Sequence, residues 1–186
     1  ASDVYKRQVP TLSDEMACGG HTGSVPVGGF SITESGHTYR YLWLMSLRSW
    51  QYNAQTGSDC GGTLTKVNRG TIAYSMDDGP WTRLDATVSW DPRQPFTAGA
   101  IYQPPLGPDA GYIYFYGYVY DQLCGFGCTG SPTNNAVYLM RVYARHSHVT
   151  SQAKYEYWYG GAWHKDADCG SPGCGQNLAD RVIPKS

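Results

Sequence analysis

Apolar and polar residues alternate along several short segments of this chain, the pattern that half-buried β-strands produce. The clearest alternation lies in residues 39–50, 112–120 and 137–143, which we expect to form strands. No window carries the periodicity of an amphipathic helix. The chain is therefore predicted to be all-β. Weaker patterns predict further strands in 25–27, 30–32, 64–67, 71–75, 96–102, 155–158 and 178–184.

Turn-forming residues separate these segments and predict how neighbouring strands connect. Residues 68–70 (Asn-Arg-Gly) predict a three-residue hairpin turn. Residues 160–161 (Gly-Gly) predict a turn that pairs 155–158 with the region around Trp163. In 77–81 (Asp-Asp-Gly-Pro-Trp), we expect the aspartates to cap turn amides and the glycine to take a positive φ.

Two stretches of the chain carry the same order of features: an aromatic strand, a cysteine-bearing loop, a second strand and a turn closed by tryptophan. β units that recur at a spacing of tens of residues are typical of propeller blades. We therefore expect a partial β-propeller of antiparallel sheets in 24–186, preceded by a loop in 1–23. The two predicted blades span about 36–93 and 96–168.

Composition supports β structure and narrows the classes of partner. The chain has 16 tyrosines and 6 tryptophans in 186 residues, and aromatic residues favour half-buried sheet surfaces. The formal net charge is −1 with the charges interspersed, so no nucleic-acid partner is expected. No apolar run is long enough to predict a membrane span. Residues 1–8 lack the apolar centre of a signal peptide and resemble translated adapter remnants, so part of 1–23 is expected to be artefactual.

The six cysteines lie in glycine-rich loops, which indicates disulfides and an oxidising, extracellular compartment. The alternatives are free thiols and a zinc site that combines close-spaced cysteines with His146 or His148. These two imidazoles share one face if their segment is extended, where they could ligate a metal or face solvent. We expect no metal or other cofactor. Six cysteines allow 15 connectivities, and the spacing favours three pairs. These pairs are Cys124–Cys128, Cys169–Cys174 and Cys18–Cys60.

No established catalytic motif is present, but carboxylates lie among aromatic residues, as they do in carbohydrate sites. Sugars stack on aromatic rings, and glycoside hydrolysis uses two carboxyl groups. The alternative roles are turn capping for the aspartates and a buried ion pair for Arg141. The catalytic candidates are Asp77, Asp78 and Glu156, and the substrate-binding candidates are Arg141, Tyr155, Trp158 and Asn134.

Three motifs in a fixed order carry a family resemblance: 137–142 (Val-Tyr-Leu-Met-Arg-Val), 155–158 (Tyr-Glu-Tyr-Trp) and 161–163 (Gly-Ala-Trp). They resemble a family long catalogued as a domain of unknown function. Its members have a five-bladed β-propeller fold and include microbial endo-D-arabinanases. The resemblance covers residues from about 24 to 184. It implies that the chain contains about two of the five blades.

The resemblance implies a secreted, carbohydrate-active protein whose partner is a polysaccharide and whose full-length parent is a monomer. A non-catalytic glycan-binding or adhesion module and a structural extracellular protein are the alternatives, since a fold does not fix function. The family's first blade carries a Gly-Asp-Thr motif that this chain lacks. We therefore expect the chain alone to be inactive as a glycoside hydrolase, and catalysis by its parent stays open.

Overall fold

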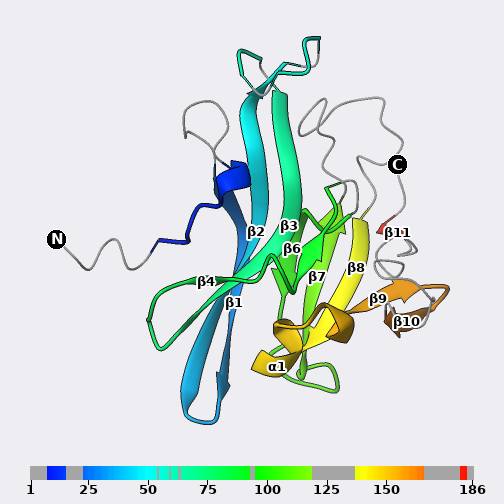
Figure 1. The fold of residues 1–186 in the computed structure, drawn as a ribbon. Helices are drawn as coiled ribbons and strands as arrows, with labels where there is room; N and C mark the ends of the chain where they lie inside the picture. Colours follow the sequence, from blue (N-terminus) through cyan, green and yellow to red (C-terminus); the bar gives the residue numbers. More distant parts are fainter. Residues whose placement is uncertain are drawn as a thin grey trace.

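The computed structural model describes residues 8–15, 23–53, 55–58, 60–62, 64–92, 95–118, 137–165 and 181–183. These residues form two antiparallel β-sheets with short helical turns (Figure 1). The N-terminal sheet contains β1 (Ser24–Glu34), β2 (His37–Tyr52), β3 (Leu64–Met76), β4 (Thr82–Arg83) and β5 (Ser89–Trp90). The C-terminal sheet contains β6 (Ala98–Tyr102), β7 (Tyr112–Tyr118), β8 (Val137–Tyr143), β9 (Glu156–Tyr159), β10 (Ala162–Lys165) and β11 (Arg181–Ile183). The helical turns are η2 (Ser13–Glu15), α1 (His146–Val149) and η3 (Gln152–Lys154).

Each sheet is an up-and-down meander in which the strands follow the order of the chain. The N-terminal sheet runs β1-β2-β3-β4, with β5 paired to β3, and the C-terminal sheet runs β6-β7-β8-β9-β10, with β11 paired to β8. The prediction of an all-β fold with antiparallel sheets is confirmed, and the strand predicted in 96–102 forms as β6 at a sheet edge. A meander is also the topology of a propeller blade, but the propeller itself stays a prediction. Strand β1 precedes the predicted unit 36–93 and yet belongs to the same sheet.

The connection predicted at 68–70 is wrong, because β3 is one continuous strand through these residues. Val67 and Arg69 pair with Leu47 and Ser46, which are adjacent on β2. Asn68 is therefore an extra residue that forms a bulge rather than a turn. Strand β2 is 16 residues long and supplies partners on both sides of the bulge. Pairing with the long strand β2 therefore keeps residues 68–70 extended, although their sequence is typical of a turn.

Two other local expectations are corrected by the structure. The turn after β3 forms as predicted, but Asp77 and Asp78 adopt positive φ values of 48° and 61°, and Gly79 does not. Asparagine and aspartate tolerate this region better than other residues with a side chain. Residues 146–148 are not extended, because they lie in α1. The turn at 160–161 is confirmed, and both of its glycines have positive φ as a type I′ hairpin requires.

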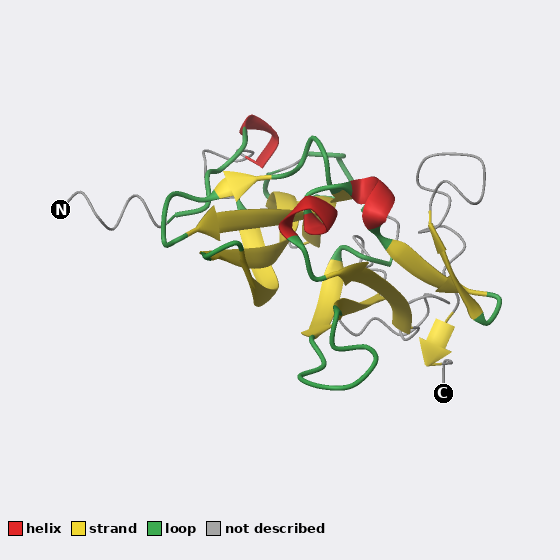
Figure 2. Cartoon of the chain, turned by 90° about the horizontal axis from the view of Figure 1, so that it is seen from below, coloured by secondary structure: helices red, strands yellow, loops and turns green. Residues whose placement is uncertain are grey.

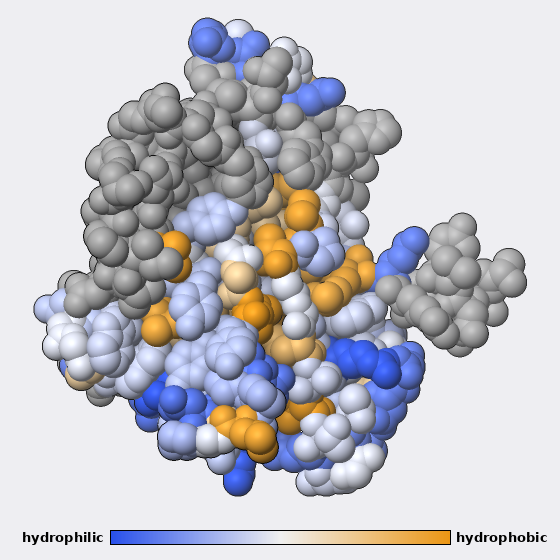
Figure 3. Space-filling view, turned by 180° about the vertical axis from the view of Figure 1, so that it is seen from behind, coloured by the Kyte–Doolittle hydropathy of each residue, from blue (hydrophilic) through white to orange (hydrophobic). Residues whose placement is uncertain are grey.

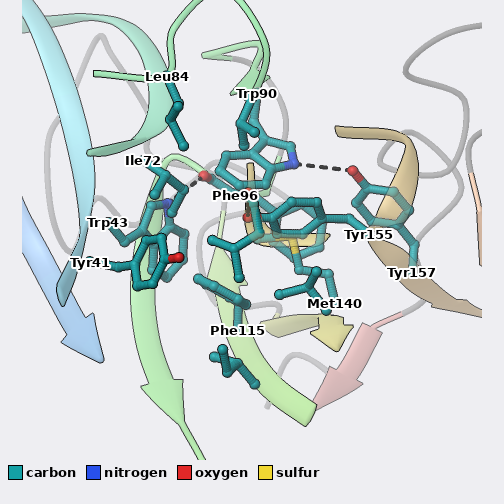
Figure 4. Packing of buried hydrophobic residues seen from close by; sticks show 14 of the residues in the cluster. Tyr41, Trp43, Ile72, Leu84, Trp90, Phe96, Phe115, Met140, Tyr155 and Tyr157 are labelled. Atoms are coloured by element: carbon teal, nitrogen blue, oxygen red, sulfur yellow. Dashed lines mark hydrogen bonds between the residues drawn. The ribbon is translucent and has the colours of Figure 1, made fainter. Parts of the chain in front are cut away.

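The larger of the two hydrophobic clusters among the described residues lies between the two sheets, and about half of its buried side chains are aromatic (Figure 4). Trp43 of β2 and Phe115 of β7 are fully buried and meet edge to face, with their ring centroids 5.3 Å apart. Trp90 of β5 donates its indole N–H to the hydroxyl of Tyr157 of β9 at 3.1 Å. Buried tryptophan and tyrosine need such partners for their polar atoms. The core therefore joins the sheets through directed contacts as well as through apolar packing.

Residues 95–97, which lead into β6, are packed tightly against both sheets. The carbonyl oxygen of Phe96 accepts a hydrogen bond from the indole nitrogen of Trp43 at 3.2 Å. A Cβ atom at Gly70 of β3 would collide with this same carbonyl, and one at Gly117 of β7 would collide with the carbonyl of Pro95. Glycine at both positions lets the backbone of the connection touch the backbone of each sheet.

Part of the N-terminal loop is built into the first sheet. Glu15, at the end of η2, is fully buried and accepts hydrogen bonds from Ser24, Ser46 and Arg83. Burial alone would raise the pKa of this carboxyl, but the hydrogen bonds, that from Arg83 first among them, hold it below its usual value. Arg83 also donates two hydrogen bonds to Asp85. A buried carboxylate is costly without such partners, so η2 is fixed to the sheet. The adapter-like residues 1–7 lie outside the described residues.

On the face seen from behind, apolar side chains of the described residues lie in several places with polar residues between them (Figure 3). Seen from below, helical turns lie in the middle of the view, where the two sheets come together (Figure 2). No helix among the described residues is long and apolar enough to cross a membrane. The most exposed large apolar side chains are Met76, Tyr102, Leu106, Tyr143 and Tyr159.

We expect the substitution Gly70→Ala to lower the free energy of unfolding by about 2–3 kcal/mol, because the added methyl group meets backbone that cannot move aside cheaply. Gly23→Ala is the matched control, since a Cβ there meets nothing within 4 Å. The measurement is the midpoint of urea unfolding. Equal midpoints for the two variants would contradict the tight fit of the connection.

Candidate functional site

A row of side chains crosses the outer face of the C-terminal sheet from one edge to the other. Tyr102 of β6 pairs with Tyr114 of β7, which pairs with Arg141 of β8. Arg141 in turn pairs with Glu156 of β9, and Glu156 pairs with Lys165 of β10. Directly opposed residues in antiparallel strands point to the same face of the sheet. We call these five residues the transverse row.

Arg141 is the best fixed member of the transverse row. Its Nε donates a hydrogen bond to Oε2 of Glu156 at 2.8 Å. Its guanidinium carbon lies 4.1 Å from the ring centroids of both Tyr112 and Trp163, so the cation is stacked between two aromatic faces. Burial alone would lower the pKa of Arg141, but hydrogen bonds, first to Glu156 and then to Tyr114, raise it above its usual value. A permanent positive charge therefore sits in a rigid place on this face.

Tyr114 and Arg141 line one hollow together with a second carboxylate, that of Asp109, which lies in the loop before β7. Burial is the main cause that raises the pKa of the Tyr114 hydroxyl; Arg141 opposes the rise and Asp109 adds to it. Arg141 pairs with Glu156, and the charge of Asp109 acts on Tyr114, so both carboxylates act on this part of the face.

Two hollows lie beside Arg141 on this face. The tyrosine hollow has a volume of about 300 Å³ and is lined chiefly by Tyr102, Tyr114, Tyr116, Asp109, Arg141 and Trp163. The basic hollow has a volume of about 220 Å³ and is lined by Tyr112, Tyr143, His148, Lys154, Glu156 and Lys165. Aromatic surface and hydrogen-bonding groups therefore converge on both sides of one fixed cation.

The structure places Asp77 and Asp78 in the N-terminal sheet, where they organise a turn. Asp77 binds the ring of His37 at 2.6 Å and accepts a hydrogen bond from the backbone N–H of Thr38 at 2.8 Å. The hydrogen bond with His37 is the main cause that lowers the pKa of Asp77. Asp78 forms an ion pair with Arg40 of β2. Their partners belong to the β1–β2 hairpin, whereas Glu156 binds Arg141 in the other sheet.

The predicted binding residues separate into two environments. Arg141 and Trp158 lie on the outer face with Glu156, and Trp158 meets Trp163 edge to face with centroids 5.2 Å apart. Tyr155 is fully buried and donates its hydroxyl to the backbone carbonyl of Val149. Its ring packs in the core and has no face that a ligand can reach.

Asn134 lies outside the described residues, as do five of the predicted disulfide cysteines, so the pairing stays a prediction. Those five are Cys18, Cys124, Cys128, Cys169 and Cys174.

His146 joins α1 to the N-terminal sheet through a cluster of tyrosines. Its ring stacks on Tyr39 with centroids 4.1 Å apart, meets the edge of Tyr74, and shares a hydrogen bond with the hydroxyl of Tyr41 at 2.8 Å. Its backbone N–H donates to the carboxylate of Glu34 at 2.9 Å. Burial lowers the pKa of His146, and the charge of Glu34 opposes this only in part. No three His, Cys, Asp or Glu side chains of the described residues gather as a metal site would require.

The chain matches no known family model, no curated protein and no solved structure.

Sequence reasoning missed Tyr112, Tyr114, Asp109 and Lys165 as members of the site. The alternation in 112–118 was a usable signal, because a tyrosine stands at every second position and all of these tyrosines therefore lie on one face of β7. The glycine turn at 160–161 was another, since a two-residue hairpin sets Lys165 opposite Glu156. Asp109 had no such signal, because its position depends on the loop between β6 and β7.

We expect the free energy of unfolding to fall as the pH drops through about 6.5, the usual histidine value. The folded-state pKa values of His146 and His148 are both lowered, by burial first and for His148 also by Lys154, Arg145 and Lys165. The unfolded chain then binds more protons than the folded chain between the folded-state pKa and 6.5. The stabilising contribution is complete above this window and is lost below it.

The matched variant is His146→Phe, which keeps a ring against Tyr39 and removes one titrating group. Urea unfolding between pH 7.5 and pH 5 should show a smaller loss of stability for this variant than for the unmodified chain. The same loss in both proteins would show that His146 does not contribute.

Proposed function

We propose that the outer face of the C-terminal sheet binds a carbohydrate, and that the chain belongs to a secreted, carbohydrate-active protein. The observation that carries this proposal is Arg141, held between Tyr112 and Trp163 and paired with Glu156 beside the tyrosine hollow. Sugars present apolar ring faces that pack on aromatic rings, and hydroxyls that bind charged groups. This face offers aromatic rings for the apolar faces of a sugar and charged side chains for its hydroxyls.

The rigidity of the face supports binding. Ion pairing and stacking fix the guanidinium before a ligand arrives, so little side-chain freedom remains to be lost on association. Tyr102 is 51% exposed at the edge of the tyrosine hollow and can offer an open ring face. A sugar seated there would reach the carboxylate of Asp109, which lines the same hollow. The partial propeller, its glycan partner and its secretion are parts of the same proposal, which the resemblance to the endo-D-arabinanase family supports.

A second proposed function is glycoside hydrolysis by the full-length parent. Two carboxylates lie near Arg141 on one face: Glu156 is hydrogen-bonded to it, and Asp109 lines the same hollow as Arg141. Hydrolysis needs two carboxyl groups roughly 5–9.5 Å apart, one as acid and the other as base or nucleophile. In this proposal Glu156 and Asp109 take the two roles, and the turn residues Asp77 and Asp78 take neither.

We expect Trp163→Ala to bind about tenfold more weakly to a glycan that retards the unmodified chain. A stacked aromatic contact is worth about 1 kcal/mol, and the stacking of Arg141 is lost with it. Affinity electrophoresis in gels that contain arabinan, xylan, dextran, dextran sulfate or polygalacturonate measures the change. Thermal unfolding of the variant checks that the fold is retained.

The control for this experiment is Tyr159→Ala, which removes an exposed aromatic ring from the same β9–β10 hairpin. Successive residues of a strand point to opposite faces, so Tyr159 lies away from Glu156 and Trp158. Equal losses for the two variants, or no retention of the unmodified chain by any glycan, would contradict the proposed binding face.

For the hydrolytic proposal, we expect the full open reading frame that contains this chain to release oligosaccharides from arabinan. Glu156→Gln should lower the rate by about 10²-fold or more, because it removes a general acid–base group. Chromatography of the released sugars measures the rate. No release by the unmodified parent, with binding retained, would contradict hydrolysis and leave binding as the function.

A further inference from the structure

The basic hollow differs from the tyrosine hollow in the charge of its walls. Its lining brings together Lys154 of η3, Lys165 of β10 and His148 of α1, three elements that are separate in the chain. Glu156 is the carboxylate among the lining residues, and its charge is matched by Arg141 at 2.8 Å. The walls of the hollow therefore carry an excess of positive charge.

Neighbouring residues strengthen this excess. The guanidinium of Arg145 lies 5.6 Å from the ring centroid of Tyr143, which lines the hollow. Burial first, and then the charges of Lys154, Arg145 and Lys165, lower the pKa of His148, and the charge of Glu34 opposes this. The whole chain has a net charge of −1, so this concentration of cations is a local feature.

The size and the walls of the hollow limit what it can hold. Sites for drug-sized ligands measure about 300–1,000 Å³, and this hollow, at about 220 Å³, is smaller. Its volume can hold one charged group together with the sugar ring to which that group is attached. Tyr112 and Tyr143 supply ring edges and faces beside the cations, and their own centroids lie 5.3 Å apart. An anion attached to a saccharide ring meets both kinds of wall at once.

We propose that the basic hollow binds the anionic group of an acidic glycan, a carboxylate or a sulfate ester, while the neighbouring sugars lie along the tyrosine hollow. This inference rests on the proposed glycan binding and names its ligand class. The two hollows lie on either side of one fixed group: Arg141 lines the tyrosine hollow, and its partners Tyr112 and Glu156 line the basic hollow. One chain of sugars can therefore use both.

The test compares polymers that share a backbone and differ in charge. Affinity electrophoresis is run with dextran against dextran sulfate, and with polygalacturonate against its methyl ester. We expect retention by at least one of the charged polymers and at least tenfold weaker retention by its neutral counterpart. The pair that shows the difference identifies sulfate or carboxylate as the group. Retention by the charged polymer should weaken as salt rises, because partly exposed charges are screened.

We expect retention by the charged polymer to weaken about fivefold in Lys154→Gln and about fivefold in Lys165→Gln. Such a change corresponds to the loss of one partly exposed charge interaction. Lys66→Gln is the control, because it removes the same charge from β3 of the other sheet.

Equal retention by charged and neutral polymers, with binding still weakened by Trp163→Ala, would overturn the inference of an acidic glycan and keep the proposed binding face. An equal effect of all three lysine variants would also overturn it, as non-specific attraction. No retention by any polymer would overturn the proposed function and this inference together.

Discussion

The close approach of the inter-sheet connection to both sheets is the constraint on which the rest of the structure depends. The backbone around Phe96 lies against Gly70 on one side, while the adjacent Pro95 carbonyl lies against Gly117 on the other. Trp43 fixes this arrangement by donating to the Phe96 carbonyl from within the core. Because no side chain separates these backbones, the spacing of the sheets is set by main-chain contact. The aromatic core then fills the remaining space with rings from both sheets.

The outer face of the C-terminal sheet follows from that packing. With Phe115 turned into the core, its neighbour Tyr114 must point outward, and the register of β7, β8 and β9 then brings Arg141 and Glu156 beside it. The stacking of Arg141 between two rings is a consequence of the same register. The proposed binding face and the core are therefore two sides of one sheet, and a change in register would move both.

Much of the fold was predictable from local pattern, and the candidate site was predictable only in part. Alternation identified the aromatic strands, and the paired glycines identified the hairpin that ends in Lys165. Arg141 and Glu156 were recognised as candidates, but their ion pair joins β8 to β9 across α1 and η3, so no local rule could fix it. Tyr155 was misread because alternation tells which residues share a face and not which face meets the core.

The sequence by itself determined the all-β class, the positions of the main strands and the residue types available to a carbohydrate site. These follow from side-chain alternation and turn chemistry, which act over a few residues. Tertiary structure alone decided that 68–70 forms a bulge, that Glu15 is buried with Arg83, and that Arg141 is stacked between two rings. The physical reason is that each of these depends on partners brought together by packing from distant parts of the chain.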